Sequence, residues 1–288
     1  MISLQTILNG LLLGGFYAAI ALGLSLVFGV MRLVNLAYGE LLVGGAFLAY
    51  AITRATGVDP LITLVAVAPM LFCIGYAIQR LLLTGLLRRG AEPPLVATFG
   101  LSVLAQTAFI ALWTGNPKSL SAPYATAGVT VLGATVRSIY VIAFVIGILV
   151  VAAMQLMLTR TRFGVALRAA SADPDTASTM GIDVKHIYAA TFGIGAAIAA
   201  IAGVLIGVAF SFTPTSGITW LLIGFTVTVL GGAGSVFGTL VGGLMVGLIE
   251  TIGGALVGGS YQELVVYAAF VLVIALRPRG ILGKGATA

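Results

Sequence analysis

Two long stretches of this chain carry no charged side chain, and they limit its fold more than any other feature. Residues 139–158 contain no Asp, Glu, Lys or Arg, and neither do residues 187–249. A helix needs about 20 consecutive apolar residues to cross lipid hydrocarbon. Charged residues make up only 8% of the chain, against about 25% in soluble proteins. The sequence therefore predicts an all-α integral membrane protein, a polytopic helical bundle forming a single domain over residues 1–288.

We expect eight to nine membrane segments, some of them short. Segments 41–52 and 218–230 fall below the length needed for a full crossing. They are therefore predicted to be broken or re-entrant helices, and their matching places in the two halves point to a transport pathway. The other apolar runs predict segments at 7–30, 61–83, 92–113, 139–158, 187–210, 236–256 and 263–276.

The distribution of Lys and Arg predicts the orientation, because these residues accumulate on the cytoplasmic side. Arg32, the loop 80–92, the segment 159–186 and the C-terminal tail carry most of them. This places the N-terminus outside, the C-terminus inside and the main outer loop at 115–138, with an extended piece at 129–132. The formal net charge of +6 then reflects topology, and no nucleic-acid partner is expected.

Glycine is frequent, at 39 of 288 residues, and several glycines are spaced four apart. Such pairs allow helix backbones to approach closely within a membrane. A tightly packed bundle is therefore expected around the pairs Gly10/Gly14, Gly203/Gly207, Gly238/Gly242 and Gly243/Gly247.

The segment 159–186 is a polar island between the two uncharged stretches, and it has the signals of folded structure. A short helix is expected over 163–170. Asp173 can cap a second helix, with Pro174 at its first position and Asp175 in its first turn. Gly181 is a suitable stop for that helix. We therefore predict two short helices at the cytoplasmic membrane surface.

Several polar residues inside apolar segments are candidates for a transport pathway. Arg32 and Glu40 could pair at a broken helix, since charged groups at depth tend to be functional. They could instead form an interfacial turn, in which Glu40 lies at a helix N-terminus, and this interpretation is favoured. Glu250 faces either a polar cavity or the outer interface, and both alternatives stay open. The full set of pathway candidates is Arg32, Asn35, Glu40, Thr98 and Glu250.

No motif for catalysis or for metal binding is found. His186 is the only histidine and Cys73 the only cysteine, and the glycines of 231–238 lack the spacing of a dinucleotide motif. We expect neither an enzyme nor a bound cofactor or metal. The uncharged segments favour a neutral or zwitterionic cargo, and the lack of an intramembrane acid–base chain weighs against an ion-coupled secondary transporter.

Five stretches resemble one family, the Liv-type permeases of ABC importers for branched-chain amino acids, and are closest to its H-type subunit. The strongest resemblance lies in residues 9–50, NGLLLGGFYAAIALGLSLVFGVMRLVNLAYGELLVGGAFLAY. Tyr38 and Glu40 are mild departures, since an aspartate is commoner at the second position. The other stretches are EPPLVATFGLS (92–102), GVALRAASADPDTASTMGIDV (164–184), FTVTVLGGAGSVFGTLVGGLMVGLIE (225–250) and RPRGILG (277–283).

The resemblance implies a complex in the bacterial plasma (inner) membrane. Its partners would be a second permease subunit, commonly non-identical, two cytoplasmic ATPases that use the ATP, and an extracytoplasmic substrate-binding protein. Urea, short amides and small aromatic acids are the alternative cargoes within the family. The island 159–186 would be the coupling loop, with the ATPase-coupling residues Arg162, Gly164, Arg168, Ala169, Asp173, Asp175, Gly181 and Ile182.

Overall fold

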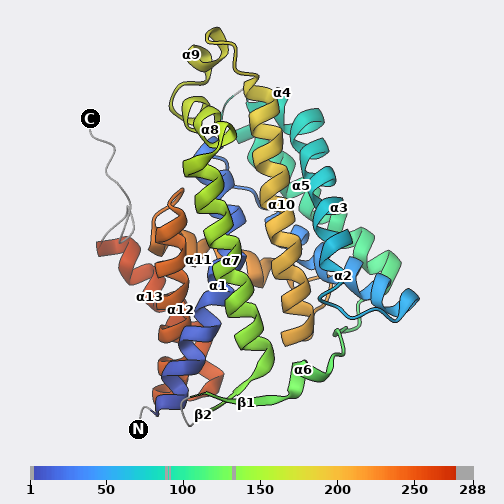
Figure 1. Ribbon diagram of the computed structural model, residues 1–288, viewed down its shortest axis with the longest axis vertical. Helices are drawn as coiled ribbons and strands as arrows, with labels where there is room; N and C mark the ends of the chain where they lie inside the picture. Colours follow the sequence, from blue (N-terminus) through green and yellow to red (C-terminus); the bar gives the residue numbers. More distant parts are fainter. Residues whose placement is uncertain (1–2, 88–89, 91, 132–133, 277–288) are drawn as a thin grey trace.

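The chain forms an elongated bundle of helices with one small hairpin at one end (Figure 1). The computed structural model describes residues 3–87, 90, 92–131 and 134–276, so the matched tail 277–283 lies outside the described residues. The helices are α1 (Leu4–Met31), α2 (Tyr38–Thr56), α3 (Leu64–Ala77), η1 (Ile78–Leu83), α4 (Thr84–Leu87), α5 (Glu92–Trp113), α6 (Pro123–Thr126), α7 (Ser138–Arg160), α8 (Arg162–Ala172), α9 (Pro174–Thr179), α10 (Val184–Ala209), α11 (Gly217–Gly231), α12 (Val236–Val257), η2 (Gly259–Tyr261) and α13 (Gln262–Leu276).

Six spans among the described helices are long and apolar enough to cross a membrane, by length and composition. They are α1, the continuous run Leu64–Leu87, α5, α7, α10 and α12. This confirms a polytopic helical membrane protein. The predicted eight to nine segments are not reached by this criterion, since α11 and α13 are shorter apolar helices of 15 residues each.

Helix α1 lies at the centre of the bundle and packs against α7, α10, α11 and α12. Its contact with α12 depends on glycine. A Cβ atom on Gly14 would lie 2.5 Å from Leu244 Cα, and one on Gly243 would lie 2.6 Å from the Gly14 carbonyl oxygen. The two backbones therefore touch, as predicted from the pairs Gly10/Gly14 and Gly243/Gly247. The other pairs also lie at tight contacts. Gly203 of α10 lies against the backbone of α2, and Gly238 and Gly242 of α12 lie against the backbone of α11.

The chain turns back into the bundle between α1 and α2. Arg32 ends α1 in the left-handed conformation, with φ 51°, and α2 then begins at Tyr38. The Tyr38 hydroxyl donates to the Ile20 carbonyl at 2.7 Å, near the middle of α1. Helix α2 therefore starts deep in the protein. It is longer than the predicted 41–52, because Tyr38–Glu40 already form its first turn.

Helix α11 also begins inside the bundle, beside the start of α2. Gly217, its first residue, lies against the backbone of Gly39. A side chain at either glycine would separate the two helix starts. The predicted short segment 218–230 is confirmed as a short helix, Gly217–Gly231. The two segments that the sequence predicted to be short, α2 and α11, meet at their N-terminal ends.

The two ends of the bundle differ. One carries the N-terminus, α6 and the hairpin of β1 (Gly128–Val131) and β2 (Ala134–Arg137), and the other carries α8 and α9 (Figure 1). Strand β1 confirms the extended piece expected over 129–132 as far as Val131, and residue 132 lies outside the described residues. The predicted outer loop and the predicted coupling loop thus lie at opposite ends of the molecule.

Candidate functional site

Helix α8 is fixed to the end of α7 by two residues of the predicted coupling set. Gly164 lies directly against the Leu158 backbone, where no Cβ atom would fit. One turn later, the Arg168 guanidinium donates to the Leu158 carbonyl. A cation at this point also interacts favourably with the C-terminal end of α7. Movement of α8 would therefore be transmitted directly to a helix of the bundle.

Helix α9 begins at Asp173, as the sequence predicts. The Asp173 carboxylate accepts from the backbone N–H groups of Asp175 and Thr176, at 3.0 and 3.1 Å. The hydrogen bonds from Thr176 hold the pKa of Asp173 below its usual value. Pro174 is the first helical residue, and Gly181 follows the helix with φ 84°. The predicted cap, first residue and stop are all confirmed.

The remaining residues of the predicted set lie around this turn. The Ala169 carbonyl accepts from Asp173 N–H at 3.1 Å, and Ile182 N–H donates to the Ala177 carbonyl at 3.1 Å. Arg162 and Asp175 have exposed side chains. The structure therefore gathers all eight residues on one compact α8–α9 element.

We expect Asp173→Ala to loosen α9, because it leaves two backbone N–H groups without a partner. Hydrogen exchange at Asp175 and Thr176 should accelerate, whereas Asp173→Asn should keep most of the protection. The folded-state pKa of Asp173 is lowered, so its cap is complete above the ordinary Asp pKa of about 3.9 and weakens as pH falls through the lowered value. Unchanged protection in Asp173→Ala would contradict this role.

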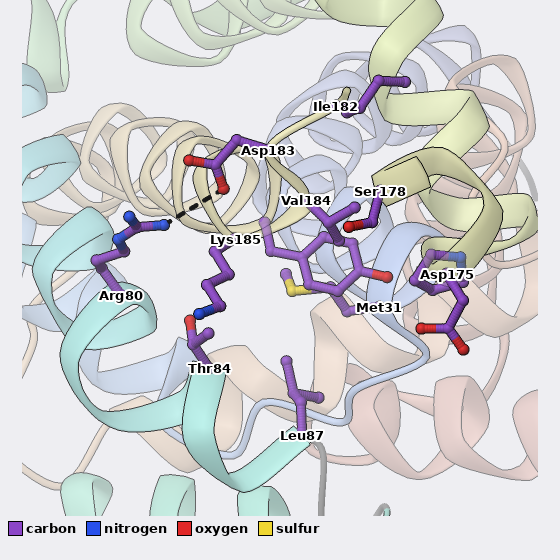
Figure 2. A pocket seen from close by; sticks show the side chains of 12 residues that line it. Met31, Arg80, Thr84, Leu87, Asp175, Ser178, Ile182, Asp183, Val184 and Lys185 are labelled. Carbon is purple, nitrogen blue, oxygen red and sulfur yellow. Dashed lines mark ion pairs between the residues drawn. The ribbon is translucent and has the colours of Figure 1, made fainter. Parts of the chain in front are cut away.

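A cleft of about 520 Å³ opens beside α9, between the start of α10 and the end of α4 (Figure 2). Arg80 and Asp183 form an ion pair across it, with Nη1 and Oδ1 3.6 Å apart. Asp183 also caps α10 by accepting from His186 N–H at 3.0 Å. This hydrogen bond and the Arg80 cation lower the pKa of Asp183. The ion pair thus connects the predicted coupling loop to the η1 segment.

Sequence reasoning missed the cleft, because its far wall comes from a different part of the chain. Thr84 and Leu87 line that wall, and Lys185 extends toward Thr84 in Figure 2. Arg80 lies in η1, a π-helical segment, and such segments are frequent at functional sites. No sequence signal distinguishes this segment from ordinary helix.

Two apolar side chains of the α8–α9 element face outward. Val165 is 57% exposed and Met180 is 79% exposed. Both lie outside the six candidate spans. Single exposed apolar residues are common on protein surfaces, so these two matter only through their place on the element that projects from the bundle.

A second group of predicted residues meets inside the bundle, at the start of α2. Thr98 of α5 accepts from Leu36 N–H at 3.3 Å. The side-chain oxygen of Asn35, Oδ1, accepts from Ala37 N–H at 3.0 Å. The Glu40 carboxylate accepts from the Ser102 hydroxyl of α5 at 3.2 Å. Asn35, Glu40 and Thr98 are therefore brought together, and Ser102, which was not predicted, joins them.

Arg32 does not belong to this group, so the predicted pair with Glu40 is wrong. The Arg32 side chain is exposed, whereas Glu40 is only 6% exposed. The inward turn at 33–37 separates the two residues. The favoured alternative placed Glu40 at a helix N-terminus, and this part is confirmed, since Glu40 lies in the first turn of α2. Its position at a membrane interface stays a prediction, and the burial of the carboxylate was not expected.

Glu250 faces a cavity, as one of the two alternatives for it predicted. Its carboxylate accepts from the Tyr17 hydroxyl at 2.7 Å. The cavity measures about 320 Å³ and is also lined by Trp220, Glu263 and Tyr267. It lies between α1, α11, α12 and α13. In the part of the chain that the structure describes, no three acidic, His or Cys side chains are placed to hold a metal ion.

Known proteins resemble the chain over nearly its full length. The family described as "Branched-chain amino acid transport system / permease component" matches residues 6–274. The permease protein BraD of a high-affinity branched-chain amino acid transport system in Pseudomonas aeruginosa is 33% identical, over 98% of this chain and 96% of that protein. The corresponding LivH of Escherichia coli is 31% identical with the same coverage.

A more distant relative has another cargo in its name. The fructose import permease protein FrcC of Rhizobium meliloti is 28% identical over 66% of this chain and 56% of that protein. No solved structure matches the chain.

Proposed function

Because this chain belongs to the family of branched-chain amino acid transport permease components, we propose that it builds one half of an ATP-driven import pathway for branched-chain or other small apolar amino acids. The match covers residues 6–274, which run from the first turn of α1 to the last turn of α13 and include the α8–α9 element. The chain is a multi-pass membrane permease subunit of an ABC importer and has no catalytic role of its own.

The α8–α9 element is the proposed docking site for a cytoplasmic ATPase. Its support is structural and chemical: it projects from one end of the bundle (Figure 1) and is fixed to α7 through Gly164 and Arg168. It also carries exposed apolar groups at Val165 and Met180. A partner that binds these side chains could move α8, and α7 together with it, as a rigid body.

The proposed assembly contains a second permease subunit, two ATPases and an extracytoplasmic binding protein, in the bacterial inner membrane. With the N-terminus outside, α2, α11 and α13 add to the six candidate spans, giving nine segments of which α2 and α11 start within the bundle. The facing starts of these two helices, at Gly39 and Gly217, support a pathway through this region.

The proposal predicts that uptake depends on ATP and on an external binding protein. Proteoliposomes holding this chain, its permease partner and the ATPases should accumulate labelled leucine only when both are supplied. Full uptake by this chain alone under an ion gradient would overturn the proposal. ATP-driven uptake of urea, amides or aromatic acids in place of leucine would leave the importer assignment standing and replace the cargo class.

A further inference from the structure

We propose that a cavity between α2, α3 and α5 binds the transported solute, with Glu40 accepting the solute's protonated amine and the cavity walls enclosing its apolar body. This inference rests on the proposed function and adds the place and chemistry of recognition. No residue of the α8–α9 element lines this cavity, so the solute site and the ATPase docking site can be tested separately.

Glu40 is a buried carboxylate with an unused acceptor. Its side chain is 6% exposed and its Oε1 accepts from Ser102 at 3.2 Å. Its buried Oε2 has no hydrogen-bond partner. An ionised carboxylate buried without a partner is strongly unfavourable unless a charge or several donors compensate it. A cationic ligand would supply that compensation.

The surrounding backbone supports a negative charge at this point. Glu40 lies in the first turn of α2, a 19-residue helix. Its carboxylate also lies directly against Gly217, the first residue of the 15-residue helix α11. Both N-terminal ends carry partial positive charge. They favour the ionised form without neutralising it, so the carboxylate remains available to an incoming ammonium group.

The cavity beside Glu40 suits a small apolar body. It measures about 270 Å³, just below the usual range of about 300–1,000 Å³ for drug-sized ligands, and it runs from Glu40 to Phe109 and Trp113. Leu48, Leu71 and Ile74 supply further wall. Gly44 also lines it, so a larger residue there would narrow the space toward Phe109.

One carboxylate at the end of an apolar chamber selects a definite ligand class. A sugar would leave its many hydroxyl groups without partners along these walls. An anion without an ammonium group would be repelled by Glu40. A small molecule with one ammonium group and a branched hydrocarbon body satisfies both parts of the site. Branched-chain amino acids have this form, and their own carboxylate would be compensated by the partial positive charge at the N-terminal ends of α2 and α11.

The test uses the assembled importer in proteoliposomes with a diazirine analogue of leucine as photoprobe. Illumination should label side chains of the cavity, Leu48 or Phe109 among them, and excess leucine should suppress the labelling. Glu40→Gln should reduce labelling and raise the KM of uptake by about tenfold or more, the effect expected when a charged hydrogen bond is lost. Glu40→Asp should retain part of both. The matched control Glu92→Gln alters an exposed carboxylate and should change neither.

A second variant distinguishes loss of solute binding from misfolding of the Glu40→Gln protein. Ala105→Phe fills the cavity from α5 and leaves Glu40 itself unchanged, and it should also abolish labelling while ATPase binding persists. Normal labelling in Glu40→Gln, or labelling confined to residues outside the cavity, would overturn this inference and leave the proposed function intact. Cavity labelling that depends on Glu40 in an assembly without ATP-driven uptake would support the site and refute the proposed function.

Discussion

Arg168→Glu should strongly reduce ATP-driven uptake while the chain remains folded in the membrane. The substitution removes the hydrogen bond from the guanidinium to the Leu158 carbonyl. It also places a carboxylate beside the carbonyl groups at the end of α7, where negative charge is unfavourable. Helix α8 would then no longer move together with α7. Uptake should fall at least about tenfold, a loss comparable to that of one charged hydrogen bond, and should be measured beside membrane content.

Two controls separate this effect from a general effect of charge. Arg168→Lys keeps the cation and should retain part of the uptake. Arg54→Glu makes the same reversal near the end of α2, far from α8 in the chain, and should leave coupling unchanged. The docking surface is tested by Met180→Asp, which should weaken ATPase binding, since Met180 is 79% exposed. Normal uptake in Arg168→Glu would show that α8 is not the coupling element.

The α8–α9 element was predictable because its signals are local. Asp173, Pro174 and Gly181 each act on backbone groups within a few residues. The structure confirms the cap, with Asp173 accepting from Thr176 N–H at 3.1 Å. The length of α5 followed equally from its uninterrupted apolar run, since it begins and ends where predicted. Helix α2 did not follow in this way, because its first turn, Tyr38–Glu40, is polar and was assigned to the preceding break.

The environment of Glu40 was not predictable, because it depends on contacts between distant segments. Ser102 is 62 residues away in the chain, and Gly217 lies still further on. The sequence shows a charged residue after a break, which is equally compatible with an interfacial turn. Only the inward course of residues 33–37 buries the carboxylate, and that course is stabilised by Thr98 and by the bond from Tyr38 to Ile20.

Gly247→Leu should prevent stable folding of the bundle, the largest structural effect expected in this chain. A Cβ atom at this position would collide with the Gly10 carbonyl oxygen and with Gly14 N, and would lie 2.6 Å from Gly14 Cα. These are backbone atoms of the central helix α1, so no side chain can move aside. Overpacking of a core by a methylene costs roughly 1–3 kcal/mol, and separating α1 from α12 would cost more because their contact depends on close backbone approach.

The measurement is the fraction of detergent-solubilised chain that elutes as a monodisperse species, with its Tm. Gly100→Leu is the matched control, since Gly100 lies in the transmembrane helix α5 with nothing within 4 Å of its added Cβ. It makes the same substitution in the same kind of segment and should leave Tm unchanged. Equal behaviour of the two variants would show that α1 and α12 are not held together by glycine contact. A Tm and a monodisperse fraction that are higher in Gly247→Ala than in Gly247→Leu would show that the distance between the two backbones sets the stability.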